Sequence, residues 1–552
     1  MGPSPREIIV IESSDDEQPV TTSQESSSTK SATSGSLGRK QKASIKRSAS
    51  VEVIEIDGDF TGKKHRASAP LRYIDPSIHF TTAQRAPAAH NVDCVTLESL
   101  VGDPDLEIIV QINYMIEIDF FMEKVHESIR DVLRIIVYHG LRTMEQHQDL
   151  EAIARAKYPN VTVYHVPVPG FGTHHTKAML LFYRDNTMQV VVHTANIIER
   201  DWRNKTQAVF TTGRLKKKDQ PSENPTCAFE HDLLEYLQNY NNHLVMTSRV
   251  SQYDFTGIRG VLIGSVPGRF SGSDKNKWGH MRLRSVLKQQ VEIPKEYKQG
   301  SKIICQMSSI GSLGKDAEDW LRGEFESSLN AHRNSNYLAS SKADLCVVYP
   351  TAENVRTSYD GWAMGWSLPF RSTSYNKQAH YLDPLLHSWK AIKSGRERAM
   401  PHIKTFTRVT SKAEGDYLSW FLLTSANLSK PAWGETHRDG AFSIQSYELG
   451  VLLFPELFEN IGETGENFQV YMMNTTLMNP YPEPQSFISA LSNERESASN
   501  DSDDHLEGNI GVVRIRLPYD LPLQKYDLEV DHVWLADKFF PGVDDFGKTL
   551  QR

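Results

Sequence analysis

The sequence lacks the features that mark several common classes of protein. Its four cysteines lie far apart and form no CxxC pair, which argues against a disulfide framework or a thiolate zinc site. No run of about 18 apolar residues occurs, so no membrane-spanning segment is predicted. Acidic residues outnumber basic ones, and the formal net charge of -8 provides no overall basic surface. A nucleic-acid partner therefore requires a local basic cleft.

What the chain does contain is enough apolar material for several cores. Of its 552 residues, 39% are hydrophobic and 24% are charged, as in ordinary globular proteins. The first 87 residues differ from the rest, because serine and threonine dominate from Thr21 to Ser36 and large apolar residues are few. Such a segment buries too little surface to offset its ordering entropy, so residues 1–87 are predicted to form a disordered regulatory tail.

This tail carries two kinds of short motif. Ile8–Ile11 runs into acidic residues, and the run at 51–57 repeats the pattern. An aliphatic strand beside acid suits addition to the edge of a partner's sheet and resembles a SUMO-interacting motif, although a chance aliphatic run explains each equally well. Basic clusters at 39–42, 46–47 and 63–66 indicate nuclear-localisation signals, with solubilising charge as the alternative. The tail thus predicts a nuclear protein with SUMO or SUMOylated partners.

From about residue 90 the hydrophobic pattern becomes that of an α/β fold. Short aliphatic runs predict buried strands, and a longer stretch predicts a helix at 144–157. The predicted strands are 108–110, 134–138, 161–164 and 189–193 in the first half, and 344–349, 420–424 and 450–454 in the second. Residues 493–508 are acidic and serine-rich, which is typical of a surface loop.

The most informative feature is a weak internal duplication. Each copy reads His-x-Lys, then an aliphatic strand, then Ala-Asn and, six residues after the asparagine, tryptophan. The residues are His175, Lys177, Asn196 and Trp202 in the first copy, and His402, Lys404, Asn427 and Trp433 in the second. A single His-x-Lys is uninformative, because a structural histidine beside a surface lysine is common. Two copies with the same downstream pattern predict one site built from two half-sites, with both tryptophans in the core.

Residue alternation explains how each copy becomes a half-site. On a strand, residues i and i+2 face the same side, so each histidine and its lysine point together. If the halves pack about a pseudo-twofold axis, two imidazoles, two ammonium groups and two amides surround one space. This set suits phosphoryl transfer, in which one histidine attacks phosphorus and the other serves the leaving group. The lysines and asparagines would stabilise the transition state by about 3–4 kcal/mol per donor.

A metal-dependent alternative fits the sequence less well. His174, His175 and His193 suggest zinc ligands, but neighbouring residues on a strand face opposite sides and no third ligand lies at a familiar spacing. No cluster of carboxylates accompanies the histidines, so a two-metal mechanism lacks obvious ligands. No cofactor or metal is predicted.

The paired motif resembles the phospholipase D superfamily and, within it, the tyrosyl-DNA phosphodiesterases. The resemblance covers the chain from about residue 90 onward. The segments that carry it are 172–177, 401–405, 424–430, 446–450, 263–270 and 308–314. Phospholipases of this superfamily carry an aspartate five residues after each motif lysine, where this sequence has Phe182 and Val409. That departure favours the tyrosyl-DNA branch over a lipid-hydrolysing phospholipase D, which is the main rival.

The resemblance also implies a division of roles. His175 would be the nucleophile that forms a phosphohistidine with the DNA 3' end, and His402 would protonate the leaving tyrosine and then activate water. Glu448 and Gln207 match the residues that orient the histidines, Glu448 toward His175 and Gln207 toward His402. The residues alone leave open which histidine attacks. The positions that match DNA contacts of the family are Phe171, Ser308, Ser309, Ser358, Ser429 and Lys430. For Phe171, base stacking and core packing are both open.

The expected architecture is α/β, with two similar phospholipase D-like domains at 88–262 and 263–552, each a mixed sheet flanked by helices, related by a pseudo-twofold axis. The expected function is metal-independent hydrolysis of 3'-phosphotyrosyl bonds between single-stranded or duplex DNA and a topoisomerase I-derived peptide. Other 3' adducts would be processed too. This describes a DNA-repair nuclease of exonuclease type that acts in the nucleus, as a monomer without membrane contact. The second rival, a non-catalytic repair scaffold, is disfavoured by two complete half-sites.

Overall fold

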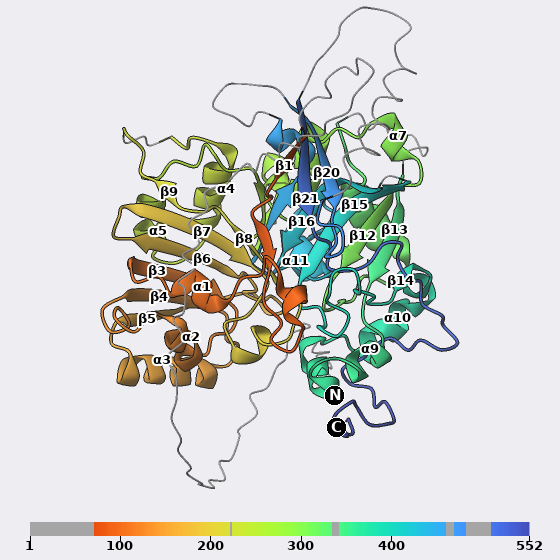
Figure 1. Ribbon diagram of the computed structural model, residues 1–552, viewed down its shortest axis with the longest axis horizontal. Coiled ribbons are helices and arrows are strands. Elements are labelled where there is room, and N and C mark those ends of the chain that lie inside the picture. Colours follow the sequence, from red (N-terminus) through yellow and green to blue (C-terminus); the bar gives the residue numbers. More distant parts are fainter. Residues whose placement is uncertain are drawn as a thin grey trace, which may run out of the picture.

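The protein is built around two mixed β-sheets that lie side by side and are covered by helices (Figure 1). The computed structural model describes residues 71–220, 224–333, 342–413, 415–459, 468–481 and 509–550. The tail motifs predicted between residues 8 and 66 and the acidic loop predicted at 493–508 lie outside these residues. Each helix in the described part of the chain is too short or too polar to cross a lipid bilayer.

The first sheet has the strand order β2-β8-β7-β6-β3-β4-β5, and the short β9 pairs with β7. The strands β3, β4 and β5 run parallel, whereas β6, β7 and β8 continue the sheet in antiparallel pairs. Their bounds are β2 (Ile78–Phe80), β3 (Leu106–Asn113), β4 (Arg134–His139), β5 (Val161–His165), β6 (Ala178–Tyr183), β7 (Thr187–His193), β8 (Ala208–Thr211) and β9 (Leu215–Lys216).

The second sheet repeats this order and adds three strands at one edge. β10-β19-β16-β15-β12-β13-β14 corresponds strand by strand to β2-β8-β7-β6-β3-β4-β5, with the same parallel and antiparallel pairs. β20, β21 and β1 extend it beyond β16. The bounds are β1 (Leu71–Ile74), β10 (Val261–Ser265), β12 (Lys302–Gln306), β13 (Asp344–Val348), β14 (Leu386–His387), β15 (Lys404–Lys412), β16 (Gly415–Thr424), β19 (Glu448–Leu453), β20 (Phe468–Asn474) and β21 (Asn509–Ile515). The predicted duplication is therefore a duplication of structure.

Helices cover the outer faces of both sheets, and a small sheet of β11 (Gly268–Phe270), β18 (Phe442–Ile444) and β17 (Glu435–Thr436) lies beside them. The helix predicted at 144–157 is confirmed as α3, which begins at a capping box formed by Thr143 and Gln146. The helices are α1 (Leu97–Val101), α2 (Ile118–Lys124), α3 (Met144–Lys157), α4 (Ala228–Leu237), α5 (Leu244–Val250), α6 (Gly279–Gln290), α7 (Lys295–Lys298), α8 (Glu326–Leu329), α9 (Ala352–Arg356), α10 (Ser372–Leu382) and α11 (Lys430–Trp433).

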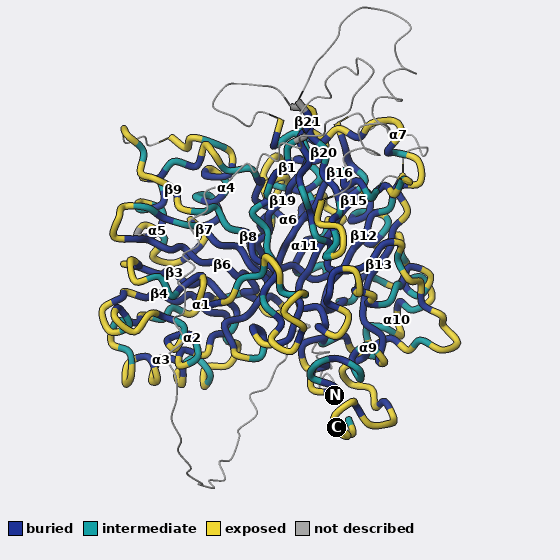
Figure 2. Tube along the Cα trace, in the orientation of Figure 1, coloured by how far each residue is buried: buried dark blue, intermediate teal, exposed yellow. Residues whose placement is uncertain are grey.

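The strands that form the sheets' centres are buried on both faces, as continuous aliphatic runs predict. One buried cluster lies between the first sheet and helices α1 to α3, and includes Ile109 and Val137. A larger cluster starts on the other face of that sheet, at Phe182, and continues to Leu449 in the second sheet. The halves therefore share a core (Figure 2), in which the buried parts of the two sheets meet without an exposed strip between them.

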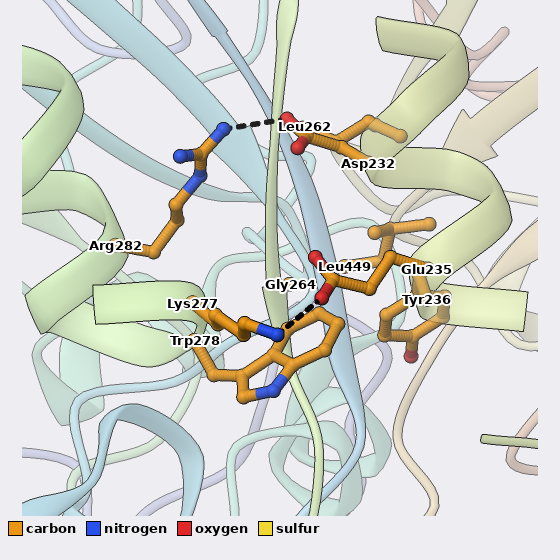
Figure 3. A pocket seen from close by; sticks show the side chains of 9 residues that line it. All are labelled: Asp232, Glu235, Tyr236, Leu262, Gly264, Lys277, Trp278, Arg282 and Leu449. Atoms are coloured by element: carbon orange, nitrogen blue, oxygen red, sulfur yellow. Dashed lines mark hydrogen bonds and ion pairs between the residues drawn. The ribbon is translucent and has the colours of Figure 1, made fainter. Parts of the chain in front are cut away.

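A groove between α4 and α6 marks the seam of the two halves on the helical side. Figure 3 shows its walls, with Tyr236 and Trp278 packed together at a ring separation of 6.1 Å. Two ion pairs span it, Arg282 to Asp232 at 2.8 Å and Lys277 to Glu235 at 2.9 Å. The seam is thus closed by side chains from both helices.

Two predicted boundaries are wrong. The strands β1 (Leu71–Ile74) and β2 (Ile78–Phe80) lie inside the range predicted as a disordered tail, and they pair with β21 and β8. The boundary predicted between 262 and 263 cuts β10, all of which pairs with β19 in the second sheet. The short strands β1 and β2 gain their stability from partners far away in the chain. Local hydrophobic patterns do not reveal such pairing.

Candidate active site

The first half-site centres on His175, at the end of the segment that leads into β6. Its Nδ1 lies 2.9 Å from Oε2 of Glu448, the first residue of β19 in the other half. The backbone N–H of His175 donates to the carbonyl of Tyr447 at 2.9 Å, so the main chain holds the two segments together as well. Both side chains are buried, which strengthens their electrostatic interaction.

The second half-site repeats this arrangement with the halves exchanged. Nδ1 of His402 lies 3.0 Å from Nε2 of Gln207, which immediately precedes β8. The N–H of His402 donates to the carbonyl of Thr206 at 3.0 Å, just as His175 uses Tyr447. Each histidine therefore depends on a residue of the opposite half, and the predicted cross-half pairs occur in the structure.

Hydroxyl groups hold Glu448 and Gln207 in place in the same way in both halves. Thr194 donates its hydroxyl to Oε1 of Gln207 at 2.7 Å and accepts the N–H of Ala208 at 3.1 Å. Ser425 makes the equivalent bonds, to Oε2 of Glu448 and from the N–H of Leu449. Each hydroxyl lies two residues before the motif asparagine, so the repeated unit extends to Thr/Ser-Ala-Asn.

The lysines lie beside their own histidines. Nζ of Lys177 donates to the carbonyl of His175 at 2.8 Å, and Nζ of Lys404 donates to that of His402 at 2.6 Å. Both lysines are buried. Lys177 also lies 6.0 Å from the ring centre of Tyr114, a distance typical of a cation–π contact. Two ammonium groups are thus held in a largely dehydrated space, where they interact strongly with an anion.

The asparagines stand at the ends of β7 and β16 but have different surroundings. Oδ1 of Asn427 accepts the backbone N–H groups of Ser308 and Ser309 at 3.2 and 3.1 Å. Oδ1 of Asn196 and the hydroxyl of Ser309 are buried without a hydrogen-bond partner among the described residues. Buried polar atoms of this kind are rare, and here they lie where a polar ligand would satisfy them.

The charges around His402 show that the half-sites meet. Burial, followed by the positive charges of Lys404, Lys205, Lys177 and His175, lowers the pKa of His402 well below its ordinary value. Lys177 and His175 belong to the first half, so their influence requires both half-sites to border one space. His402 is consequently neutral at neutral pH when no anion is bound.

A buried ion pair lies directly behind His402. Oδ2 of Asp201 lies 3.5 Å from Nδ1 of His402 and accepts the N–H of Asn196 at 2.7 Å, while Oδ1 contacts Nζ of Lys205. Lys205 also contacts the hydroxyl of Ser367. Burial tends to raise the pKa of Asp201, but Lys205 and its other partners outweigh this and lower it, so the carboxyl stays ionised. The equivalent positions of the second copy of the repeat hold Ala432 and Thr436, so the repeat does not supply a second such pair.

Comparison with known proteins agrees with this geometry. The model of the tyrosyl-DNA phosphodiesterase family matches residues 77–527. The chain belongs to the tyrosyl-DNA phosphodiesterase family.

Relatives and solved structures of the family show how much of the chain is shared. Tyrosyl-DNA phosphodiesterase 1 of Arabidopsis thaliana is 32% identical over 529 residues, covering 93% of this chain and 81% of that protein. A probable tyrosyl-DNA phosphodiesterase of Schizosaccharomyces pombe is 31% identical over 458 residues, covering 70% and 83%. The crystal structure of the yeast tyrosyl-DNA phosphodiesterase superposes with a TM-score of 0.56 at 20% identity, covering 84% of this chain and all of that one. This last likeness confirms the predicted fold.

Within this tyrosyl-DNA phosphodiesterase fold, the motif segments are not strands. His175 and Lys177 lie just before β6, and only Lys404 of the second motif belongs to β15. The backbone N–H groups of His175 and His402 are held by the opposite half, whereas the carbonyl of Lys177 accepts the N–H of His193 in its own sheet at 3.0 Å. Of the histidines considered as zinc ligands, His174 turns away to the hydroxyl of Tyr240 at 3.0 Å, as alternation predicts. His193 is buried against Trp202.

The predicted DNA-contact residues are only partly brought together. Ser308 and Ser309 lie beside Asn427, and an isolated bridge from Ile310 to Leu428 carries this strip on toward Ser429. Phe171 is 46% exposed on the loop before the first motif, which excludes core packing. Lys430 pairs with Glu435 at 3.1 Å. Ser358 is buried and its hydroxyl donates to the carbonyl of Gly361 at 3.3 Å, and its predicted DNA contact stays a prediction.

Sequence reasoning missed four residues that hold the site. Thr194 and Ser425 had a visible signal, since both occupy the same position in the repeat. Asp201 and Lys205 had none, because the second copy has no counterpart to them and an Asp and a Lys four residues apart commonly form a surface pair. Trp202 and Trp433 are buried as predicted, and Nε1 of Trp202 also donates to the carbonyl of Asn196 at 2.9 Å.

Proposed function

We propose that this protein hydrolyses the phosphodiester between a DNA 3' end and a tyrosine through a covalent phosphohistidine, without a metal ion. The observation that carries the proposal is the pair of buried imidazoles held across the halves by chemically different partners, a carboxylate on His175 and an amide on His402. The family named above supports the substrate class. The roles of the individual residues are derived from the geometry of these two contacts.

The carboxylate of Glu448 determines which nitrogen of His175 is reactive. An ionised carboxylate can only accept, so Nδ1 of His175 carries the proton and Nε2 keeps its lone pair. The negative charge beside the ring stabilises the positive charge that develops when Nε2 bonds to phosphorus. His175 is therefore the nucleophile.

The uncharged amide of Gln207 allows His402 to gain and lose a proton during the reaction. Oε1 of Gln207 accepts from Thr194, and Nε2 lies near the carbonyl of Asp201, which orients the amide nitrogen toward His402. Nδ1 of His402 also lies 3.3 Å from Oε1 of the same amide, so the amide can donate to Nδ1 of the neutral ring or accept the Nδ1 proton of the charged ring. When a bound phosphodiester favours the imidazolium, the ring can give up its Nε2 proton and keep the proton on Nδ1. His402 is therefore the proton donor to the leaving tyrosine.

The reaction balances with these two groups. Nε2 of His175 forms the bond to phosphorus as the bond to the tyrosine oxygen breaks, and that oxygen takes the proton of His402. Water then gives a proton back to His402, its oxygen attacks phosphorus, and the bond to His175 breaks, which releases a 3' phosphate. The negative charge of the substrate assists this proton transfer. A bound phosphodiester offsets the positive charges of the lysines that lower the pKa of His402, so the ring is more readily protonated.

The positive charge that the phosphoryl transition state requires is supplied by Lys177 and Lys404. Buried ammonium groups interact strongly with the non-bridging oxygens, and a comparable donor lowers a barrier by about 3–4 kcal/mol. Asn196, Asn427 and the hydroxyl of Ser309 complete the cradle. This is the physical basis for metal-independent catalysis.

The wider biological setting forms the rest of the proposal. A tyrosyl leaving group on a 3' phosphate suits peptide remnants of topoisomerase I, and other 3' adducts share the same phosphodiester. The proposed role is DNA repair in the nucleus, with removal of groups from 3' ends as an exonuclease would, and with the protein acting as a monomer because the duplication supplies both half-sites. The basic and aliphatic tail motifs, with SUMO as a proposed partner, lie outside the described residues.

A gel assay on a 3'-phosphotyrosyl oligonucleotide in excess EDTA tests the proposal. We expect cleavage to a 3'-phosphate product at an unchanged rate after chelation. Loss of activity on chelation, restored by a divalent ion, would contradict the metal-free mechanism. A phosphatidylcholine substrate serves as the control for the rival phospholipase activity, and we expect no hydrolysis of it.

A further inference from the structure

Three histidine side chains meet outside the active site, at one end of the first sheet. The ring centres of His139 and His147 are 5.0 Å apart, those of His139 and His165 are 5.6 Å apart, and those of His147 and His165 are 5.4 Å apart. Nε2 of His139 lies 3.0 Å from Nδ1 of His147. His139 is buried, His147 is half-buried and His165 is exposed, so the cluster opens to solvent at one side.

The fold brings these residues together from three different elements. His139 ends β4 and His165 ends β5, and they are register partners in the parallel pair. By alternation they continue the rows of Val137 and Val163, which pack beneath α3. His147 lies one turn before Leu150 on the buried face of α3. The two strands and the helix thus hold the three imidazoles at the edge of a buried apolar cluster.

The separations match those of imidazoles around one metal ion. With metal–nitrogen bonds of about 2.0–2.1 Å in a tetrahedral site, ligand nitrogens lie about 3.3 Å apart and ring centres about 5 Å apart. The facing nitrogens of His139 and His147 are within a few tenths of an ångström of the first value, and all three ring separations are near the second. We propose that His139, His147 and His165 bind one divalent ion of the zinc class, for which imidazole is a preferred ligand.

Binding requires two small adjustments. The hydrogen shared between His139 and His147 must move to the far nitrogen of the ring that carries it, because each ligand nitrogen needs its lone pair. If that ring is His139, the long hydrogen bond of 3.4 Å from the N–H of Leu141 to its Nδ1 must also break. The ring of His165 must turn, because neither of its nitrogens lies within 4.8 Å of both facing nitrogens. That side chain is exposed and ends its strand, so rotation meets little resistance.

Protonation also favours a metal over an anion. An anion would need imidazolium groups, but burial and the neighbours His147 and His165 lower the pKa of His139 to about 3. At neutral pH this ring is uncharged and suited to a metal ion. Arg142 and the amino terminus of α3 bring positive charge to the vicinity, so phosphate is the competing ligand that an experiment has to exclude.

A second cluster offers a comparison. His231, Asp232 and Glu235 on α4 have potential ligand atoms within 4.8 Å of one another. Both of its carboxylates are engaged by the seam ion pairs, with Arg282 and with Lys277. A metal ion there would have to displace those cations. The three-histidine cluster has no carboxylate to release, which makes it the stronger site.

The position of the cluster suggests what an ion would do. His165 leads directly into the loop that carries Phe171, and Gly140, next to His139, packs against His174. A bound ion would fasten the start of that loop to α3. It would leave the reacting groups unchanged, so it would act on the position of the loop and not on the chemistry at His175.

Cobalt(II) provides a direct test, because a tetrahedral cobalt site has strong visible absorption bands. The full-length protein is stripped with EDTA and titrated with Co²⁺, and Zn²⁺ is then added as a competitor. We expect one ion per chain and its displacement by Zn²⁺. The variants His147→Ala and His165→Ala should each weaken binding at least tenfold, and neither residue is fully buried, so the fold should be retained.

Two controls make the result decisive. His231→Ala alters the competing cluster and should leave the cobalt spectrum and affinity unchanged. His175→Ala removes the catalytic histidine and should also leave them unchanged, which separates this site from the proposed active site. Unaltered cobalt binding in a His147→Ala/His165→Ala double variant would overturn the proposal. Tight binding of inorganic phosphate that is lost in the same double variant, without cobalt binding to the wild type, would assign the cluster to anions instead.

Discussion

The two halves of this protein have the same strand order but place different side chains beside their histidines. Each sheet presents a histidine to the other half, and each histidine is held through Nδ1 by the residue at the start of the corresponding strand, β8 or β19. In one case that residue is Glu448 and in the other it is Gln207. In the proposed mechanism, this change of one side-chain group, from carboxylate to amide, distinguishes the nucleophile from the proton donor at equivalent positions.

The second difference lies behind the rings. His402 has the Asp201–Lys205 pair behind its ring, whereas the equivalent positions of the second copy hold Ala432 and Thr436. Asp201 supplies a negative charge near His402 that the uncharged Gln207 does not. This charge lies 3.5 Å from Nδ1 of His402 and is partly neutralised by Lys205. Duplication thus supplies the shared geometry of the site. Small differences between the copies then give the two histidines different surroundings.

The largest expected effect comes from removing each histidine. His175→Ala should abolish turnover and leave no covalent protein–DNA species. His402→Ala should slow turnover by about 10²–10⁴-fold and allow the phosphohistidine adduct to accumulate, because water is no longer activated to release it. Denaturing gels of enzyme with a labelled 3'-phosphotyrosyl oligonucleotide measure both. Adduct trapped by the His175→Ala variant would reverse the assigned roles.

Exchanging the two partners tests the charge difference directly. Glu448→Gln should reduce the rate of adduct formation by about 10–100-fold, as is common when a group that orients a reactive histidine is lost. Single-turnover kinetics separate adduct formation from its hydrolysis. Gln207→Glu serves as the matched variant. It leaves the contact of His175 with Glu448 intact, so it should reduce the rate of adduct formation less than Glu448→Gln does. Equal effects of both substitutions would mean that the halves are electrostatically equivalent, contrary to this account.

The loops before the two histidines offer another contrast. Phe171 lies four residues before His175 and is exposed, whereas Arg398 holds the equivalent place before His402 and pairs with Asp545 at 2.7 Å. If Phe171 stacks on a base, Phe171→Ala should cost about 1–3 kcal/mol of substrate binding and raise KM with little change in kcat. Arg398→Ala is the control and should leave KM for the DNA nearly unaltered. Similar KM values for both variants would exclude base stacking on the first loop.

Asp201 should control the pH dependence. Its negative charge lies 3.5 Å from Nδ1 and favours the protonated form of His402, so Asp201→Asn should lower the pKa of His402 further. Activity that requires protonated His402 is lost as pH rises through that pKa, so the alkaline limb of the profile should move to lower pH. Gln207→Glu should move it to higher pH. A profile of kcat against pH measures the shift, and an unmoved limb in both variants would remove His402 from the role of proton donor.

The seam on the helical side should have the smallest effect. Arg282→Met breaks the pair with Asp232, which is partly exposed, and should lower the free energy of unfolding by no more than about 1 kcal/mol. Chemical denaturation measures this loss, and kcat should be unchanged. A large fall in kcat would mean that the seam also positions the half-sites.

The central strands and the paired motif are predictable from the sequence because their signals are local or repeated. Continuous aliphatic runs identified β4, β5, β7 and β19, and the repeat brought His175 and His402 into one site. The tail boundary failed because β1 and β2 are three or four residues long and owe their stability to partners in distant segments. The expectation that the motifs are strands failed for a related reason, since the opposite half holds them. Asp201 was missed because its role depends on a contact across the halves that has no counterpart in the repeat.

The crossed contacts also affect how the protein comes into being. During synthesis, β1 emerges long before β21, the strand with which it pairs, and His175 emerges long before Glu448. A partly made chain that ends before Glu448 lacks the partner of His175. We therefore expect hydrolytic activity only once the chain extends past Glu448, and a truncated product that ends before it should be inactive. The exchange of partners between halves acts as a check on completeness, so that incomplete copies of the protein do not attack DNA.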